Sequence, residues 1–279
     1  MSAELSGRSL IIVTDLDGTL LDQQTYSYEA SLPAIGRLQQ RRIPIVFCSS
    51  KTAAEIISLQ RELGLSEPFI CESGGAIYLP PNYFPFEVTS AKRMRAFDAI
   101  EFGKNVDDLR RALGQAAQRC GVDAKSFGSM SFQEIMARTG LNANQARDAA
   151  QREYDEPFLI ESDGGEAMLV ATLAAMGLTV TRGDRFYHVT SGHDKGKAVR
   201  ELLSLYRQKN ASLLSVGLGN SANDLPLLRE TDIAVLVRNP DGHWDVEVIE
   251  RLPNVERSNA IGAQGWCEAV DRIMSRFAA

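Results

Sequence analysis

The sequence predicts an α/β fold: a Rossmann-like parallel sheet with helices on its faces, into which a second domain is inserted. Residues 10–71 and residues 195–277 both alternate short apolar runs with amphipathic helical patterns, as βαβ units do. The stretch between them mixes helices with a few short strands. We therefore expect a catalytic core formed by residues 1–84 and 190–279, and an inserted α+β domain formed by residues 85–189.

The first stretch contains three apolar, β-branched segments that are short enough for buried strands. Between them lie two segments with apolar residues at helical spacing, the second ending at Gly64. The expected strands are residues 10–14, 43–48 and 69–71, and the expected helices are residues 28–40 and 52–63.

The middle stretch begins with residues 78–88, whose three prolines favour an edge strand or a connection over a central strand. Its apolar spacing then predicts helices at residues 106–120, 131–138, 144–153 and 165–176, and strands at 157–160, 178–181 and 186–190.

The last stretch returns to the first pattern. It predicts helices at residues 197–206, 222–229 and 266–277, and strands at residues 213–218 and 233–237.

Composition narrows the class of partner. The chain has 279 residues, 44% of them hydrophobic, and a formal net charge of -6. That charge disfavours nucleic acid and anionic membranes, although a local basic pocket can still bind a small anion. The chain contains no long apolar segment, and its four cysteines form no CxxC pair. We expect a cytoplasmic protein with reduced thiols, a small-molecule substrate, and a monomeric or homodimeric state.

Polar residues follow four of the predicted strands, and ligands bind at the carboxyl ends of strands in parallel sheets. Asp15 and Asp17 follow the first strand, and Ser49 and Ser50 follow the second. The third is followed by ESGG at residues 72–75 and the fourth by GLGNSAND at residues 217–224, while a loop reading HDKGK at residues 193–197 precedes the last of these strands. Carboxylates, hydroxyls, an amide and an amine at one edge suit a divalent cation and a phosphate.

The two neighbouring aspartates indicate which reaction this edge of the sheet could catalyse. Carboxylates crowded at a strand end repel each other, and a bound Mg²⁺ would supply the missing counter-charge. Asp15 could then attack phosphorus, and Asp17 could protonate the leaving oxygen and later activate water. Ser49 and Lys195 could bind the phosphoryl oxygens and stabilise their charge.

These motifs resemble the haloacid dehalogenase superfamily. The resemblance rests on DLDGT at residues 15–19, a small hydroxyl residue after the second strand, a KG lysine and a GxxxxND loop, in that order. The order is that of its phosphatases in which the inserted domain is a cap, placed after the third core strand. The resemblance therefore implies a haloacid-dehalogenase-type core with an α+β cap that selects the substrate.

A narrower resemblance is to the mannosyl-3-phosphoglycerate phosphatase family. It rests on CSSKT (residues 48–52), MSFQEIMARTGL (130–141), REYDEPF (152–158) and RGDRFYH (182–188). It implies Mg²⁺-dependent hydrolysis of mannosyl-3-phosphoglycerate, or of its glucosyl analogue, to the glycosylglycerate, a compatible solute. It also implies an aspartyl-phosphate intermediate. The alternatives are another sugar-phosphate phosphatase, a phosphomutase of the same fold, or a binding or regulatory relative with little turnover.

The resemblance assigns the metal ligands to Asp15, Asp17, Asn220 and Asp224. Here the sequence departs from the family, which usually has an aspartate at the position of Asn220. An amide oxygen can bind Mg²⁺ but brings no charge. Either the metal binds more weakly than usual, or Asp224 takes part directly.

Candidates for substrate binding lie on both domains. In the core they are Ser50, Lys51 and Gly74. In the cap they are Arg152, Tyr154, Glu156, Arg182, Arg185 and His188. One arginine could clamp the glycerate carboxylate, but a charged helix face, a hairpin surface and a structural histidine explain the cap residues equally well.

Overall fold

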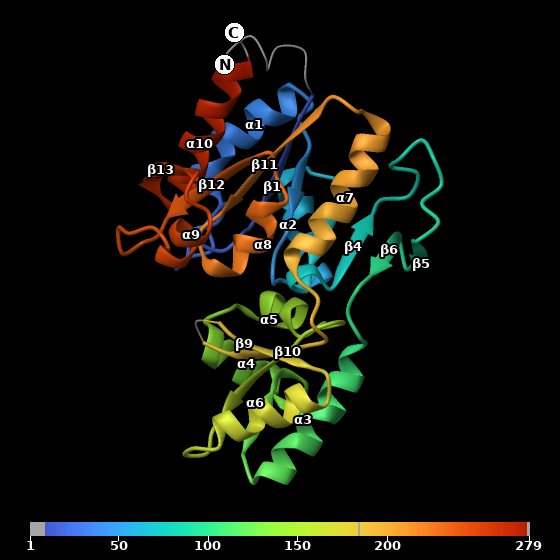
Figure 1. Ribbon diagram of the computed structural model, residues 1–279, viewed down its shortest axis with the longest axis vertical. Coiled ribbons are helices and arrows are strands. Elements are labelled where there is room, and N and C mark those ends of the chain that lie inside the picture. Colours follow the sequence, from blue (N-terminus) through green and yellow to red (C-terminus); the bar gives the residue numbers. More distant parts are fainter. Residues whose placement is uncertain (1–8, 184, 278–279) are drawn as a thin grey trace.

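The core is a five-stranded parallel sheet in the order β13-β12-β11-β1-β2 (Figure 1). The structure is a computed structural model that describes residues 9–183 and 185–277. Strands from the two ends of the chain pair directly, because β11 lies beside β1. This confirms the predicted α/β core. The strands are β1 (Ser9–Thr14), β2 (Ile45–Phe47), β11 (Leu213–Gly219), β12 (Ile233–Arg238) and β13 (Glu256–Ile261).

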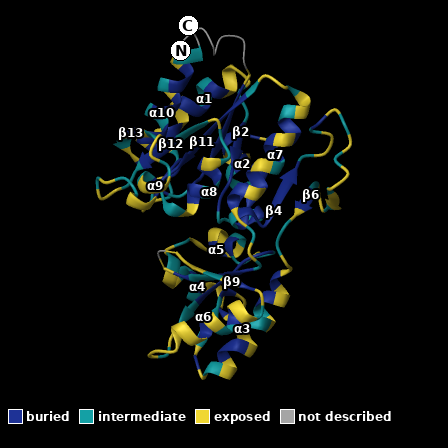
Figure 2. Ribbon diagram, viewed as in Figure 1, coloured by how far each residue is buried: buried dark blue, intermediate teal, exposed yellow. Residues whose placement is uncertain are grey.

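Helices cover both faces of this sheet. On one face lie α1 (Leu32–Gln40), α2 (Ala53–Leu63) and α10 (Gly262–Phe277), and on the other lie α7 (Lys195–Lys209), α8 (Leu225–Arg229) and α9 (Val246–Arg251). Alternate side chains of β1 pack on opposite faces, Ile12 on the first and Ile11 on the second. The strands β1, β2 and β11 are therefore buried on both sides (Figure 2). Exposed polar chemistry is confined to the strand ends.

The third predicted strand, β3 (Phe69–Cys71), differs from expectation. It touches the parallel sheet through one bridge between Cys48 and Ile70, but its main partner is an antiparallel strand. It opens a second sheet in the order β3-β4-β6-β5, with β4 (Ala76–Leu79), β5 (Lys92–Met94) and β6 (Phe97–Glu101). Because β5 and β6 pair with the core in this way, we propose that the cap begins near residue 103 and ends near residue 191.

The cap is a four-stranded antiparallel sheet, β7-β8-β10-β9, that packs against helices (Figure 1). Its strands are β7 (Ala124–Ser126), β8 (Glu156–Ile160), β9 (Thr179–Arg182) and β10 (Tyr187–Thr190), and its helices are α3 (Val106–Cys120), α4 (Phe132–Thr139), α5 (Ala143–Ala149) and α6 (Glu166–Ala175). Two apolar clusters of its own hold it together. It therefore has the build of an α+β domain, as predicted.

Several segments differ from the sequence-based expectation. The helix predicted to run from 144 to 153 ends at Ala149, because the following segment turns to bond with the core. The strands β5, β6, β7 and β13 and the helix α9 were not predicted, since they are short or carry polar residues at most positions. Across the described residues, every helix is too short or too polar to cross a membrane.

Candidate active site

Four predicted side chains meet at the carboxyl edge of the parallel sheet. Asp15 follows β1, Ser49 follows β2, and Asn220 follows β11. Lys195 is the first residue of α7 and comes from the connection that leaves the cap. The parallel register brings these ends together.

Lys195 binds two carboxylates at once. Its Nζ lies 2.7 Å from Asp15 Oδ1 and 2.7 Å from Asp224 Oδ1. All three side chains are buried, with 1% of the Lys195 side chain exposed. Gly196 allows α7 to start here, because a Cβ at this position would lie 2.8 Å from the carbonyl oxygen of Pro226.

The electrostatics of this cluster follow from burial and charge. Burial, together with the charge of Asp224, raises the pKa of Asp15 to about 7, while Lys195 opposes that rise. Burial alone would lower the pKa of Lys195, but the charges of Asp15 and Asp224 outweigh it and raise the pKa above its ordinary value. Lys195 therefore stays protonated. One ammonium shared by two carboxylates leaves negative charge that a further cation would neutralise.

Asp224 also shapes the loop after β11. Its Oδ2 accepts hydrogen bonds from the backbone amides of Asn220 at 2.9 Å and Ser221 at 3.1 Å. The Asn220 side chain accepts from Thr19 Oγ1 at 3.1 Å and donates to Asn239 Oδ1 at 2.8 Å. Both oxygens of Asp224 are thus engaged by the protein, and Asn220 Oδ1 is held facing the loop that follows β1.

Asp17 lies beside Lys51. Lys51 Nζ is 3.0 Å from Asp17 Oδ2, and it also lies over the ring of Tyr26. Asp17 Oδ1 is buried and has no hydrogen-bond partner within the described ranges. Directly after Asp17, Gly18 has a φ of +76°, and a Cβ there would lie 2.7 Å from Asn220 Nδ2. A glycine is required where the loop passes this close.

These oxygens suit a hard divalent cation. Among the described residues, Asp17 Oδ1 has no hydrogen-bond donor, and the Thr19 hydroxyl lies 3.4 Å from Asp15 Oδ2 and 3.1 Å from Asn220 Oδ1. Within residues 9–183 and 185–277, no group of three or more His, Cys, Asp or Glu side chains forms a metal site. A further ligand here would be the amide oxygen of Asn220, so residues 15, 17 and 220 together could offer a metal both charged and neutral oxygens.

The remaining core candidates surround this edge. Ser49 is buried, and its Oγ accepts from the amide of Lys51 at 3.2 Å. The carbonyl oxygen of Ser50 accepts from Arg152 Nη1 of the cap at 2.8 Å. Gly74 has a φ of +96°, and a Cβ there would lie 2.1 Å from the carbonyl oxygen of Asp194. Its contact is therefore with the residue before Lys195, which it helps to position.

The cap meets the core through the segment 152–155. Glu72 of the core is fully buried, and its carboxylate accepts from the backbone amides of Glu153, Tyr154 and Asp155 at 2.9, 2.8 and 2.8 Å. His188 Nδ1 lies 2.8 Å from Asp155 Oδ2. Of the predicted cap residues, Arg152 and His188 therefore belong to the contact between cap and core.

Tyr154 and Glu156 are engaged elsewhere. The Tyr154 hydroxyl donates to Glu101 Oε1 at 2.9 Å, so its ring anchors the cap segment on the core. Glu156 is fully buried and pairs with Arg110 Nε at 2.9 Å and the amide of Gly128 at 2.6 Å. Both side chains already have structural partners.

Arg182 and Arg185 lie on the β9–β10 hairpin of the cap. Arg182 is exposed and stacks over the ring of Tyr187. Arg185 is exposed and donates from Nη1 to the carbonyl oxygen of Thr139 at 2.6 Å. These contacts join both side chains to other cap residues.

Sequence reasoning missed three residues at this contact: Glu72, Asp155 and His193. His193 Nε2 lies 3.1 Å from the carbonyl oxygen of Glu72. Glu72 opens the ESGG turn and Asp155 lies inside REYDEPF, so both motifs were seen. Nothing in their spacing indicated that these two residues, which are 83 positions apart in the sequence, would be in contact.

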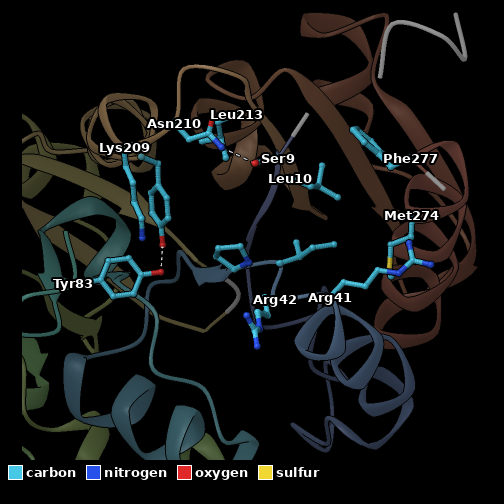
Figure 3. A pocket seen from close by; sticks show the side chains of 13 residues that line it. Ser9, Leu10, Arg41, Arg42, Tyr83, Lys209, Asn210, Leu213, Met274 and Phe277 are labelled. Atoms are coloured by element: carbon cyan, nitrogen blue, oxygen red, sulfur yellow. Dashed lines mark hydrogen bonds between the residues drawn. The ribbon is translucent and has the colours of Figure 1, made fainter. Parts of the chain in front are cut away.

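A separate pocket of about 470 Å³ lies at the opposite edge of the parallel sheet (Figure 3). Leu10 and Leu213, near the amino ends of β1 and β11, line it together with Tyr83, Lys209 and Arg41. None of the predicted catalytic residues contributes to its lining. The catalytic edge is therefore at the other end of the strands.

The fold and the aspartate–lysine centre define a capped hydrolase with a parallel α/β core, and a family model for haloacid dehalogenase-like hydrolases matches residues 12–156. A glucosyl-3-phosphoglycerate/mannosyl-3-phosphoglycerate phosphatase from Methanococcoides burtonii is 40% identical over 95% of this chain and 97% of its own. A phosphatase of the same name from Persephonella marina is 34% identical over 96% and 98%. The crystal structure of a haloacid dehalogenase-like hydrolase from Bacteroides thetaiotaomicron shares the fold, with a TM-score of 0.65 at 18% identity over 95% and 100% of the two chains.

The chain therefore belongs to the glucosyl-3-phosphoglycerate/mannosyl-3-phosphoglycerate phosphatase family of the haloacid dehalogenase-like hydrolases. The family resemblance expected from the motifs is confirmed, and the protein is a phosphatase. Hydrolases of this superfamily generally use a divalent metal.

Proposed function

We propose that this phosphatase hydrolyses mannosyl-3-phosphoglycerate or its glucosyl analogue, with Mg²⁺, through a phosphorylated Asp15. The observation that carries the proposal is the buried contact of Lys195 with Asp15 at the end of β1. The names of the relatives, at 34–40% identity over nearly the whole chain, support the substrate.

The reaction divides into two steps on this chain's own residues. Asp15 attacks phosphorus, the ester bond to the glycerate oxygen breaks, and Asp17 gives its proton to that oxygen. Asp17 then takes a proton from water, whose oxygen attacks phosphorus and releases phosphate and ionised Asp15. Lys195 stabilises the charge on Asp15 and the phosphoryl group throughout. Lys51, at 3.0 Å, stabilises Asp17 while it is ionised.

Asp15 and Asn220 would hold the Mg²⁺ with side-chain oxygens, and Asp17 would hold it with its backbone carbonyl oxygen, which leaves the Asp17 carboxyl group to carry the catalytic proton. When bound, it would neutralise the carboxylates and the incoming phosphate. We favour Asn220 over Asp224 as the third ligand, because Lys195 and two backbone amides already engage Asp224. A cytoplasmic location, proposed on composition, agrees with four free thiols.

A substrate panel tests the proposed function. Phosphate release should be measured with mannosyl- and glucosyl-3-phosphoglycerate, glucose 6-phosphate and p-nitrophenyl phosphate, with Mg²⁺ and with EDTA. We expect kcat/KM for one glycosyl-phosphoglycerate to exceed that for glucose 6-phosphate by at least about 100-fold, and Asp15→Asn to be inactive. A preference for glucose 6-phosphate, or isomerisation of a sugar phosphate without net phosphate release, would contradict the proposal.

A further inference from the structure

Two buried polar atoms at the contact between cap and core have no protein partner. They are Arg152 Nε, a donor, and Asp155 Oδ1, an acceptor, and neither forms a hydrogen bond with any described residue. Only 8% of the Arg152 side chain and 1% of the Asp155 side chain are exposed. Buried polar groups in folded proteins are nearly always hydrogen-bonded, so such a pair indicates a binding site.

The other atoms of these two side chains fix their positions. Arg152 Nη1 donates to the carbonyl oxygen of Ser50 and lies 3.5 Å from Asp155 Oδ2. His188 Nδ1 lies 2.8 Å from the same Asp155 oxygen. The guanidinium and the carboxylate are therefore neighbours, and each keeps one buried atom without a hydrogen bond to a described residue.

The backbone that carries them is also held. Glu72 binds the amides of Glu153, Tyr154 and Asp155, and Gly75 lets the Tyr154 ring pack closely, since a Cβ at Gly75 would lie 2.5 Å from Tyr154 Cβ. The open donor and the open acceptor are thus fixed before a ligand arrives. Such preorganisation reduces the entropic cost of binding.

The chemistry of the pair selects its ligand. A phosphate or carboxylate would accept from Arg152 but would be repelled by Asp155, and an amine would be repelled by Arg152. A hydroxyl accepts one hydrogen bond and donates another, so it can satisfy both atoms. The bond from Arg152 to Ser50, the residue after Ser49, places the pair beside the catalytic edge.

We propose that Arg152 Nε and Asp155 Oδ1 form a subsite for a sugar hydroxyl, through which the cap recognises the glycosyl group. The proposal rests on the proposed function, in which the glycosyl group is attached to the carbon next to the one that bears the phosphate ester. It assigns Asp155 a role in specificity that its position in the sequence did not indicate.

Two variants test the subsite. Asp155→Asn keeps the shape and can still bond with His188 through its oxygen, but it puts an amide donor where the unpaired acceptor Oδ1 now lies. Arg152→Lys keeps the charge but removes the guanidinium, and with it both Nε and the present bond from Nη1 to Ser50. Each should lower kcat/KM for the preferred glycosyl-phosphoglycerate by about 10- to 100-fold, the range for a lost hydrogen bond to a charged group. Activity on p-nitrophenyl phosphate, which has no sugar hydroxyl, should stay within about threefold of wild type, because the catalytic edge is unchanged.

Product inhibition gives a second measurement. If Asp155 had only a structural role, its replacement would not change the inhibition constant of one product selectively. The glycosylglycerate should inhibit Asp155→Asn more weakly than wild type, whereas inorganic phosphate should inhibit both equally. Asp148→Asn is the matched control. It removes a carboxylate from the same contact, where Asp148 is paired with Ser58 at 2.9 Å, and it should leave both inhibition constants unchanged.

The outcomes separate the two proposals. An equal loss of kcat/KM on both substrates would show that Asp155 only holds the cap in place. No loss on either substrate would show that water alone binds to Arg152 Nε and Asp155 Oδ1. Either result would overturn the proposed subsite. A wild type that releases phosphate from p-nitrophenyl phosphate but from neither glycosyl-phosphoglycerate would overturn the proposed function, and the subsite with it.

Discussion

Lys195 Nζ lies 2.7 Å from Asp15 Oδ1, although the two residues are 180 positions apart in the chain. The contact joins the first strand of the core to the helix that follows the cap. The insertion therefore separates in sequence two groups that the parallel sheet reunites in space. Both are buried, so each depends on the other for its charge.

Replacing Lys195 with methionine should remove both activity and stability. We expect kcat to fall at least about 10²–10³-fold, as when a preorganised donor to the developing charge is lost. The free energy of unfolding should fall by about 3–5 kcal/mol, because Asp15 and Asp224 lose their shared counter-charge in a buried site. Urea unfolding and phosphate release measure the two effects. Lys197→Met is the matched control, since Lys197 is exposed over the ring of Phe102; a similar loss there would contradict the assignment.

The titration of Asp15 gives a pH prediction for the metal-free protein. Folding raises its pKa from 3.8 to about 7. The folded state therefore favours the protonated form, and the stability that Asp15 contributes is present at low pH and is lost as pH rises through about 7. Relative to Asp15→Asn, the wild type should lose a few kcal/mol of unfolding free energy between about pH 5 and pH 8.

Urea unfolding in EDTA across this range measures the difference between the two proteins. Added Mg²⁺ should reduce it, because a cation favours ionised Asp15. A difference that stays constant with pH would contradict the raised pKa.

The sequence predicts those parts of the fold and the site that depend on the pattern of neighbouring residues. The buried strands before Asp15 and after Lys195 are short apolar runs, and the polar residues at their ends must face one edge of a parallel sheet. The strands β5 and β6 lack this signal, because their burial comes from pairing with β4 and not from their own apolar content. Pairings between distant segments, such as Glu72 with Asp155, are set by the docking of the cap and have no counterpart in local spacing.

Because Asn220 is uncharged, we expect this site to bind the metal more weakly than a site with aspartate at that position. Asn220→Asp should add a negative charge to the ligand set and raise Mg²⁺ affinity by about tenfold or more. The new carboxylate would face Asn239 Oδ1, which now accepts from Asn220 Nδ2, so a turn of the Asn239 amide must accompany the change. Calorimetric titration of Mg²⁺ measures the affinity. Asn239→Asp adds the same charge nearby without supplying a ligand; equal gains in the two variants, or none in Asn220→Asp, would contradict a direct role for residue 220.

Glu72 should control how firmly the cap is held. In Glu72→Gln the one remaining oxygen can still face the amides of Tyr154 and Asp155, but it carries no charge, and an NH₂ group replaces the oxygen that lies 2.9 Å from the amide of Glu153. We expect these amides to exchange hydrogen at least about tenfold faster. KM for the glycosyl-phosphoglycerate should rise, because Arg152 and Asp155 lose their fixed positions.

Hydrogen exchange resolved to this segment makes the measurement. Glu101→Gln is the control, since it keeps an acceptor for the Tyr154 hydroxyl on the same segment without touching its backbone. Unchanged exchange in Glu72→Gln would mean that the apolar packing of Tyr154, and not the carboxylate, holds the cap against the core.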